Sequence, residues 1–456
     1  MSRPVRTQAP PAGPEPALEL PKFATHRLAN GLRVEIARTT TTPDVAVRLV
    51  LGAGAGATVP ERAGLASLTC DLLEEGADGR SAREMAEWID GLGAAFDARA
   101  TYDDALLSMH AMNDQLDEVL EFLAAVTRRP DFAPAEVSRR RDMRLDQLRR
   151  RGDEPARVAG DALDAAVFGG HPYGAPLVGT VESVERLEAA DLAGFWARGA
   201  RPDTACLVIC GDVEPATVLA AVEREFGEWA VPPEAPPPAA PAPPAEAARA
   251  GEILLFDRPA SRQTELRIGG VGIARGEAGE EAALVMNAIL GGLFSSRVNL
   301  KLREERGWTY GARTALLRRR RPGPFLLRTA VATEATAGAF TELLAEFERL
   351  RDEPPEPAEL ELAANALTRS LPLQFQTASQ LAGRRAEMVT YELPDDYWER
   401  FPERIEAVDS AEVRDAARRL LAPDGLVLLA VGAVADFAAE LGELGPVHVS
   451  PGDRRT

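Results

Sequence analysis

The stretch GGLFSSRVNLKLREERGWTYGAR, residues 291–313, shows most clearly how this chain is organised. Ser295 and Ser296 are residue types that cap the start of a helix. Val298 and Leu302 are four residues apart and therefore lie on one face of that helix. We predict an amphipathic helix that begins just after the two serines.

The same stretch predicts a sharp reversal from helix to strand. Gly307 is a typical residue for the position after a helix, and Trp308–Tyr310 is typical of the start of a strand. Arg303 and Tyr310 flank this reversal, where a guanidinium and a phenol can together hold a carbonyl oxygen and the negative charge that develops on it. On spacing alone the plainer interpretation is favoured: a cation at a helix end and an ordinary strand tyrosine.

Length and composition limit the classes of protein that fit. The chain has 456 residues, of which 45% are hydrophobic, as in soluble globular proteins of two or more domains. Its formal charge of −19 argues against nucleic acid or an anionic membrane as a partner. The three cysteines, Cys70, Cys206 and Cys210, imply no disulfide framework.

The sequence also carries no evident targeting segment. Residues 1–20 are rich in proline and alanine but lack an apolar core, so they do not form a secretory signal. We expect no run long enough to span a membrane. If the chain begins natively at Met1, it is expected to be cytoplasmic.

An internal repeat divides the chain into two similar halves. Residues 187–213 align with residues 408–434 at a constant offset of 221, without a gap (408 minus 187). Pro202 then falls on Pro423, and Gly211 on Gly432. A chance match of two helix–turn–strand units is the alternative. We interpret each half as one α/β domain of ordinary size.

The predicted domain organisation follows from the repeat. A flexible tail over residues 1–21 precedes an N-terminal domain over 22–230. Residues 231–250 begin with VPPEAPPPAAPAPP, which is too rich in proline to pack and predicts an extended linker. A C-terminal domain over 251–450 completes the chain. The basic run Arg318–Arg321 is expected to lie at the rim of a loop.

With these two halves and four of its motifs, the chain resembles the insulinase/pitrilysin family, which includes mitochondrial processing peptidase. The motifs are ERAGLASLTCDLLEEGA (61–77), FGGHPYGAPLVGTVESV (168–184), ILGGLFSSRVNLKLREERGWTYGA (289–312) and SLPLQFQTASQLAG (370–383). The resemblance implies an α+β fold of two homologous sandwich domains. Each would carry a mixed, mainly antiparallel sheet with helices packed on it, and the pair would close like a clamshell around a peptide chamber.

The family's zinc motif, His-x-x-Glu-His, is altered at every position in this chain. The motif works because two imidazoles one helical turn apart chelate the ion and the glutamate activates the bound water. The matching residues here are Ser67, Cys70 and Asp71. The remaining ligand aligns on Gln147, or on Asp146 if the register slips by one. We therefore predict that this chain binds no metal or other cofactor and has no catalytic residue that acts alone.

The resemblance gives the pair Arg303 and Tyr310 a role. In the family the matching residues grip the substrate backbone beside the metal, and in some members they lie on a subunit without zinc. The chain is thus predicted to be the non-catalytic subunit of a heterodimeric zinc peptidase. It would bind peptide substrates and supply Arg303 and Tyr310 to a partner that keeps His-x-x-Glu-His and holds the zinc. The alternatives are a peptide-binding or structural scaffold with no role in cleavage and, last, a hydrolase that uses other residues.

Overall fold

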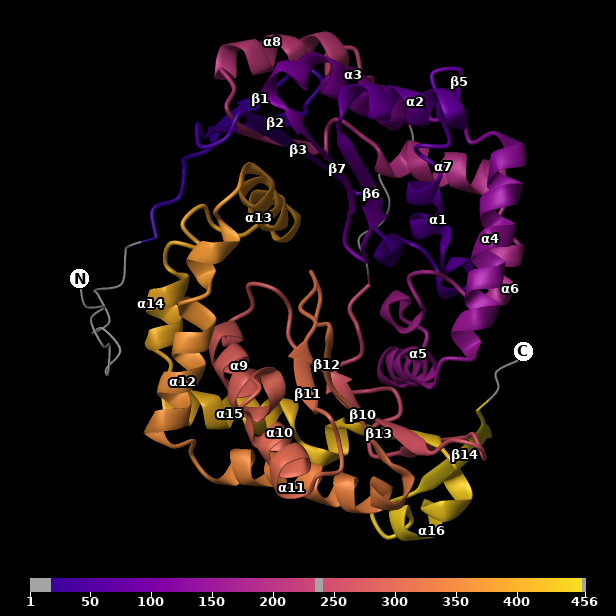
Figure 1. The fold of residues 1–456 in the computed structure, drawn as a ribbon, viewed down its shortest axis with the longest axis vertical. Coiled ribbons are helices and arrows are strands. Elements are labelled where there is room, and N and C mark those ends of the chain that lie inside the picture. Colours follow the sequence, from indigo (N-terminus) through magenta and orange to yellow (C-terminus); the bar gives the residue numbers. More distant parts are fainter. Residues whose placement is uncertain (1–17, 234–240, 453–456) are drawn as a thin grey trace, which may run out of the picture.

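The computed structural model describes residues 18–233 and 241–452 of the chain. Its architecture is two six-stranded mixed sheets, each with helices packed on it, as the α+β prediction requires (Figure 1). The first sheet has the order β1-β2-β8-β3-β7-β6 and the second the order β11-β12-β10-β13-β9-β14. In both sheets most neighbouring strands are antiparallel.

The strands of the first sheet are Ala24–Arg27 (β1), Arg33–Arg38 (β2), Asp44–Leu51 (β3), Ala95–Ala100 (β6), Ala105–Met112 (β7) and Cys206–Gly211 (β8). Those of the second are Ile253–Asp257 (β9), Gln263–Val271 (β10), Arg313–Leu316 (β11), Pro324–Ala332 (β12), Val427–Gly432 (β13) and Val447–Pro451 (β14). A short hairpin, Gly76–Ala77 (β4) and Arg80–Ser81 (β5), stands apart from both.

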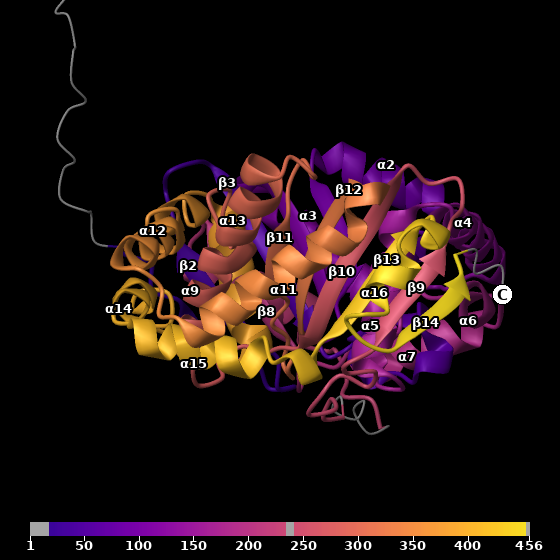
Figure 2. The same cartoon turned by 90° about the horizontal axis from the view of Figure 1, so that it is seen from below.

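The α-helices of the first half are Leu65–Asp71 (α1), Ala82–Leu92 (α2), Leu116–Arg128 (α3), Pro134–Gly152 (α4), Pro155–Phe168 (α5), Val181–Glu185 (α6), Ala189–Gly199 (α7) and Pro215–Phe226 (α8). Those of the second half are Glu280–Asn287 (α9), Arg297–Asn299 (α10), Thr336–Asp352 (α11), Pro357–Thr368 (α12), Ala378–Tyr391 (α13), Phe401–Glu406 (α14), Ser410–Leu420 (α15) and Ala438–Leu441 (α16). Figure 2 shows α11, α15 and α16 on the outer side of the second sheet.

The repeat seen in the sequence is confirmed residue by residue. Helix α7 and strand β8 map onto α15 and β13 at the offset of 221, and the two helix bounds and two strand bounds all coincide. Strand β8 runs parallel to β2 and antiparallel to β3, and β13 has the same relation to β9 and β10. The outermost strands break the symmetry, because β1 is antiparallel to β2 whereas β14 is parallel to β9.

The two halves exchange a helix. Helix α13 packs on β3 and β8 of the first sheet, and α5 packs on β10 and β13 of the second (Figure 1). Small residues permit the close approach of α13: Ala378 and Ala382 lie against Cys206 and Cys210, which are buried thiols as expected. Each half thereby covers one face of the other's sheet, and burial of these apolar faces holds the halves together.

The run Arg318–Arg321 is not a free loop rim, because Arg319 and Arg320 contact the first half and Arg318 pairs with Glu280 within the second half. Arg319 lies over the rings of Tyr102 and Tyr173, with its guanidinium carbon 3.8 and 4.4 Å from their centroids, and only 9% of the residue is exposed. The Arg320 backbone donates to Asp103 at 3.0 Å, and its guanidinium donates to the Thr390 carbonyl of α13 at 2.6 Å. Sequence alone could not show these partners, since they lie about 70 or more residues away.

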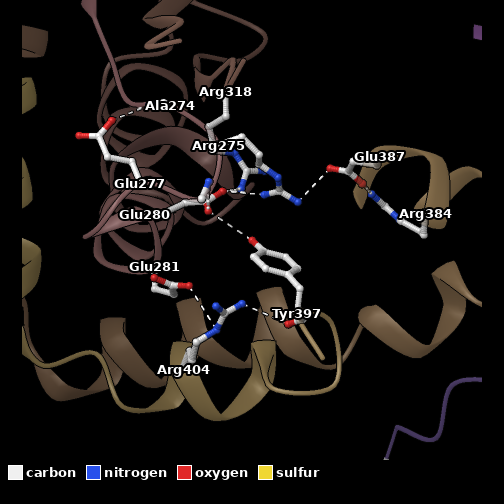
Figure 3. A network of polar contacts seen from close by, with 11 residues as sticks. Ala274, Arg275, Glu277, Glu280, Glu281, Arg318, Arg384, Glu387, Tyr397 and Arg404 are labelled. Carbon is white, nitrogen blue, oxygen red and sulfur yellow. Dashed lines mark hydrogen bonds and ion pairs between the residues drawn. The ribbon is translucent and has the colours of Figure 1, made fainter. Parts of the chain in front are cut away.

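Arg318 belongs to a buried ion network that joins α13 to the rest of the second half (Figure 3). Glu280, at the start of α9, accepts from Arg275 at 2.6 Å, from Arg318 and from the Tyr397 hydroxyl at 3.3 Å. Arg275 also donates to Glu387 of α13 at 2.9 Å. Although burial acts to raise the pKa of Glu280, the adjacent guanidinium groups of Arg275 and Arg318 hold it below its usual value.

The structure differs from the sequence predictions at three places: the strand after Gly307, the N-terminal tail and the linker. Trp308–Tyr310 does not begin a strand; β11 starts at Arg313, because Gly307 turns the chain at φ 67° and the Trp308 ring packs against Gly338 of α11. The predicted tail and linker also pack in part: Leu18 and Leu20 contact the second core, and Ala247 is buried beside α5. Residues 1–17 and 234–240 of those segments lie outside the described residues.

The expectation that no run could span a membrane is also corrected. Within the described residues, Glu280–Glu305 is long and apolar enough by length and composition. However, 61% of its most apolar window is buried inside the structure, and its backbone is extended at Leu293 and Ser296. Its apolar character therefore matches a role in the second core.

Candidate functional site

Helix α1 carries the three positions that match the zinc motif. Gly64 precedes it in the left-handed region at φ 89°, where an added Cβ would meet the Val178 carbonyl at 2.9 Å. Cys70 points into the core with 2% exposure, and burial raises the pKa of its thiol well above the usual value. Cys70 is therefore a neutral thiol packed in the first core.

Ser67 and Asp71 are the two positions that would hold the imidazoles, and both accept hydrogen bonds from Arg144. Arg144 of α4 donates from Nη1 to Ser67 Oγ at 2.9 Å and from Nη2 to Asp71 Oδ2 at 2.6 Å. The same Nη1 donates to the Val178 carbonyl at 2.9 Å, and the residue is only 7% exposed. A buried guanidinium thus lies between the two positions.

The carboxylates that follow α1 are also neutralised by arginines of α4. Glu75 pairs with Arg139 and Arg140, and Arg140 also reaches Glu74 at 3.4 Å. Burial raises the pKa of Asp71 and of Glu74 above the ordinary carboxyl values, and the nearby arginines offset only part of this effect. These acids are therefore structural ion-pair partners.

Among the described residues, the predicted third ligand position makes no hydrogen bond or ion pair with α1. Gln147 is exposed, and Asp146, the alternative by one residue, is exposed and pairs with Arg149 at 2.9 Å. Over residues 18–233 and 241–452, no group of three or more His, Cys, Asp or Glu side chains could hold a metal ion. A catalytic zinc requires about three protein ligands, so the donor set at Ser67, Cys70, Asp71 and Gln147 does not fit the ion.

Arg144 is the residue of this site that the sequence reasoning missed. A signal was present: Val137, Leu145 and Leu148 mark the buried face of α4, and Arg144 falls on that face beside them. An arginine at a buried helix position requires an acidic or carbonyl partner. Gln147 lies three residues further along the same helix, so Arg144 is its neighbour on the helix surface and lies close to the predicted third ligand position.

The second half presents Arg303 and Tyr310 in different ways. Arg303 lies in the last turn of a π-helical segment, Leu300–Glu305, and its guanidinium carbon lies 4.3 Å from the centroid of the Phe294 ring. Its Nη1 makes no hydrogen bond and approaches the Glu304 carboxylate only at 3.6 Å. Tyr310 is 94% exposed. Among the described residues, no hydrogen bond joins Arg303 to Tyr310; the Tyr310 ring is exposed, whereas the Arg303 side chain is 34% exposed and its Nη1 is buried.

Asn299 joins the loop that carries Phe294, whose ring lies against Arg303, to the segment that follows Tyr310. Its side chain donates to the Phe294 carbonyl at 2.5 Å and accepts from the Ala312 backbone at 3.1 Å, and the residue is 4% exposed. Beside it, the Thr309 hydroxyl bonds the Gly311 backbone and the Thr329 hydroxyl. The turn that presents the Tyr310 ring to solvent is therefore fixed at both sides.

Most of the chain matches two family models, and both describe peptidase family M16. Residues 33–181 match the family described as insulinase (peptidase family M16), and residues 186–367 match the one described as peptidase M16 inactive domain. Two relatives are proteins named uncharacterized zinc protease. The one from Mycobacterium tuberculosis is 28% identical over 90% of this chain and 93% of its own length. The one from Mycobacterium leprae is 29% identical over 63% of this chain and 64% of its own length.

Solved structures give the same fold. The crystal structure of a peptidase M16 inactive domain from Pseudomonas fluorescens superposes with a TM-score of 0.83 at 25% identity, over 90% of this chain and 98% of the other. A protease from Helicobacter pylori superposes with a TM-score of 0.84 at 17% identity, over 90% of this chain and all of the other. The second likeness is one of fold alone.

Proposed function

The chain belongs to the insulinase family, peptidase family M16, and on that premise we propose that it is the non-catalytic, substrate-binding subunit of a two-subunit zinc peptidase. One observation carries the proposal: the guanidinium of Arg144 contacts both positions that would hold the imidazoles of the zinc motif. A chain built in this way has no means of activating water with a metal of its own.

The partner that this role requires is a similar chain that keeps His-x-x-Glu-His. Zinc held there by its three ligands would supply the activated water. This chain's part is to bind the peptide and to orient it. The Tyr310 hydroxyl would donate to the carbonyl oxygen of the scissile peptide, and the Arg303 guanidinium would offset the negative charge that develops on that oxygen.

Two features of the second half support this part. Tyr310 is 94% exposed, so its hydroxyl can engage a group from outside the chain, and the Arg303 side chain is 34% exposed although its Nη1 is buried. Asn299 and Thr309 fix the turn between them, which limits the conformational entropy lost when a peptide binds. Exposed aromatic rings such as Tyr310 and Phe294 are common where proteins bind peptides.

The test is a peptidase assay on a quenched fluorescent peptide, with this chain, a zinc-bearing family partner and their mixture. Hydrolysis that requires the mixture supports the proposal. No hydrolysis by any of the three, with a complex still formed, is the result expected of a scaffold. Hydrolysis by this chain alone, resistant to chelators, would mean that other residues form an active site.

A further inference from the structure

We propose that Arg144 stands in for the family's metal: its guanidinium is the internal cation that joins α1 to α4, and it excludes a divalent ion from this position. The inference goes beyond the proposed function, because it concerns how this half is stabilised and why it rejects zinc. Its test needs neither a partner nor a peptidase assay, so the two proposals can fail separately.

The contacts of Arg144 reproduce the connections that a metal would make. One cation reaches two positions of α1, Ser67 and Asp71, which are one helical turn apart. It also reaches the carbonyl of Val178 in the following loop. Ser67 extends the junction, because its hydroxyl donates to the Leu177 carbonyl at 2.9 Å while it accepts from Arg144. Two helices and a loop thus meet at one guanidinium.

Charge and burial explain why the arrangement is stable. Asp71 offers a carboxylate and Ser67 an uncharged oxygen, so the guanidinium has a paired charge and a second acceptor. Removing one member of such a buried group leaves the other without its partner, which is costly. Lysine would not be equivalent, since a single ammonium lacks the planar fork that spans separated acceptors.

The same geometry predicts that restoring the ligands is not enough to restore metal binding. A divalent ion between residues 67 and 71 would lie within a few ångströms of the buried Arg144 guanidinium, and two cations at that range repel strongly at low dielectric. Arg140 is the control, because it is on the same helix and pairs with Glu74 and Glu75; it acts on Asp71 through its charge but makes no hydrogen bond to residue 67 or 71.

The experiment compares three variants of the full chain. The first carries Ser67→His, Cys70→Glu, Asp71→His and Gln147→Glu; the second adds Arg144→Met, and the third instead adds Arg140→Met. Each is equilibrated with zinc, and bound metal and the dissociation constant are measured by elemental analysis and chelator competition. We expect stoichiometric zinc only in the Arg144→Met variant, with affinity at least about tenfold higher than in the other two.

Equal zinc affinity with and without Arg144 would overturn the proposal, and so would failure of all three folded variants to bind. If the multiple variants do not fold, a double-mutant cycle in the natural chain decides. Urea unfolding of Arg144→Met, Asp71→Asn and the double variant should show that the double variant loses clearly less stability than the sum of the single losses. Additive losses would mean that Arg144 does not join the two helices through Asp71.

Discussion

The carboxylate of Asp71 and the guanidinium of Arg144 lie 2.6 Å apart, at the place where the family motif would put its second imidazole. Helix α1 has kept its position against α4, but its contact with that helix is an ion pair between protein side chains. The first half of the chain therefore has the fold of the peptidase family, with an ion pair between protein side chains at the motif positions. In the second half, the Tyr310 ring is exposed and the Arg303 side chain is partly exposed.

Substitution of the pair should lower turnover without preventing assembly. In the mixture with a zinc-bearing partner, Arg303→Ala or Tyr310→Phe is expected to reduce kcat by about 10²–10³, the typical effect of losing one donor to a developing oxyanion. Arg306→Ala is the matched control, since Arg306 is on the same turn but pairs with Glu342. Complex formation is followed by gel filtration. An unchanged rate in both variants would show that the pair does not act on the substrate.

Asn299→Ala should act on the same reaction at a distance. The substitution removes the bonds to Phe294 and Ala312, so the loop whose ring lies against Arg303 is no longer joined to the segment that follows Tyr310. We expect a loss of about 1–3 kcal/mol in the free energy of unfolding, because a buried backbone donor and acceptor lose their partner. The mixed activity should fall as well. A stable variant with full activity would show that the tie does not position the pair.

Asp164 should make the chain less stable at neutral pH than in mild acid. Burial raises its pKa to about 6, and Arg319 offsets only part of that effect. The pKa of Asp164 in the folded chain lies above the unfolded value of 3.8. The protonated carboxyl therefore contributes fully to the free energy of unfolding below pH 3.8, and this contribution is lost as the pH rises through about 6. Asp164→Asn should therefore stabilise the chain by up to about 2–3 kcal/mol above pH 6 and by little near pH 4, as measured by urea unfolding.

Glu280 should show the opposite dependence on pH. Its pKa is held below the ordinary 4.5, so its ion pairs contribute above that value and are lost as the pH falls below it. Glu280→Gln is expected to cost about 3–5 kcal/mol at neutral pH, because the buried Arg275 loses its partner (Figure 3). Glu281→Gln, which affects only a more exposed pair with Arg404, is the control. Equal losses of stability in the two variants would show that the buried network around Glu280 does not stabilise the chain more than the exposed pair does.

The sequence allowed much of the fold to be predicted because its signals are local or repeated. The offset between the α7–β8 and α15–β13 units followed from turn residues such as Pro202 and Pro423. The altered motif could be recognised for the same reason, because Ser67, Cys70 and Asp71 lie close together on one helix.

The rest depends on contacts between distant residues. The exchange of α5 and α13 rests on small residues such as Cys210 and Ala382, whose spacing in the sequence does not indicate that they meet. Arg319 lies between two tyrosines that are more than 140 residues away along the chain. Charge patterning does not identify Arg144 as the buried arginine of α4, whereas the apolar periodicity of that helix does.

The most direct measurement is the zinc content of the natural chain. Purified protein is equilibrated with excess zinc, passed through a desalting column and analysed for bound metal, with a zinc-bearing family member treated in parallel. We predict that the reference protein retains about one ion per chain and that this chain retains none in stoichiometric amount. Tightly bound, stoichiometric zinc lost on substitution of Ser67, Cys70, Asp71 or Gln147 would contradict the account.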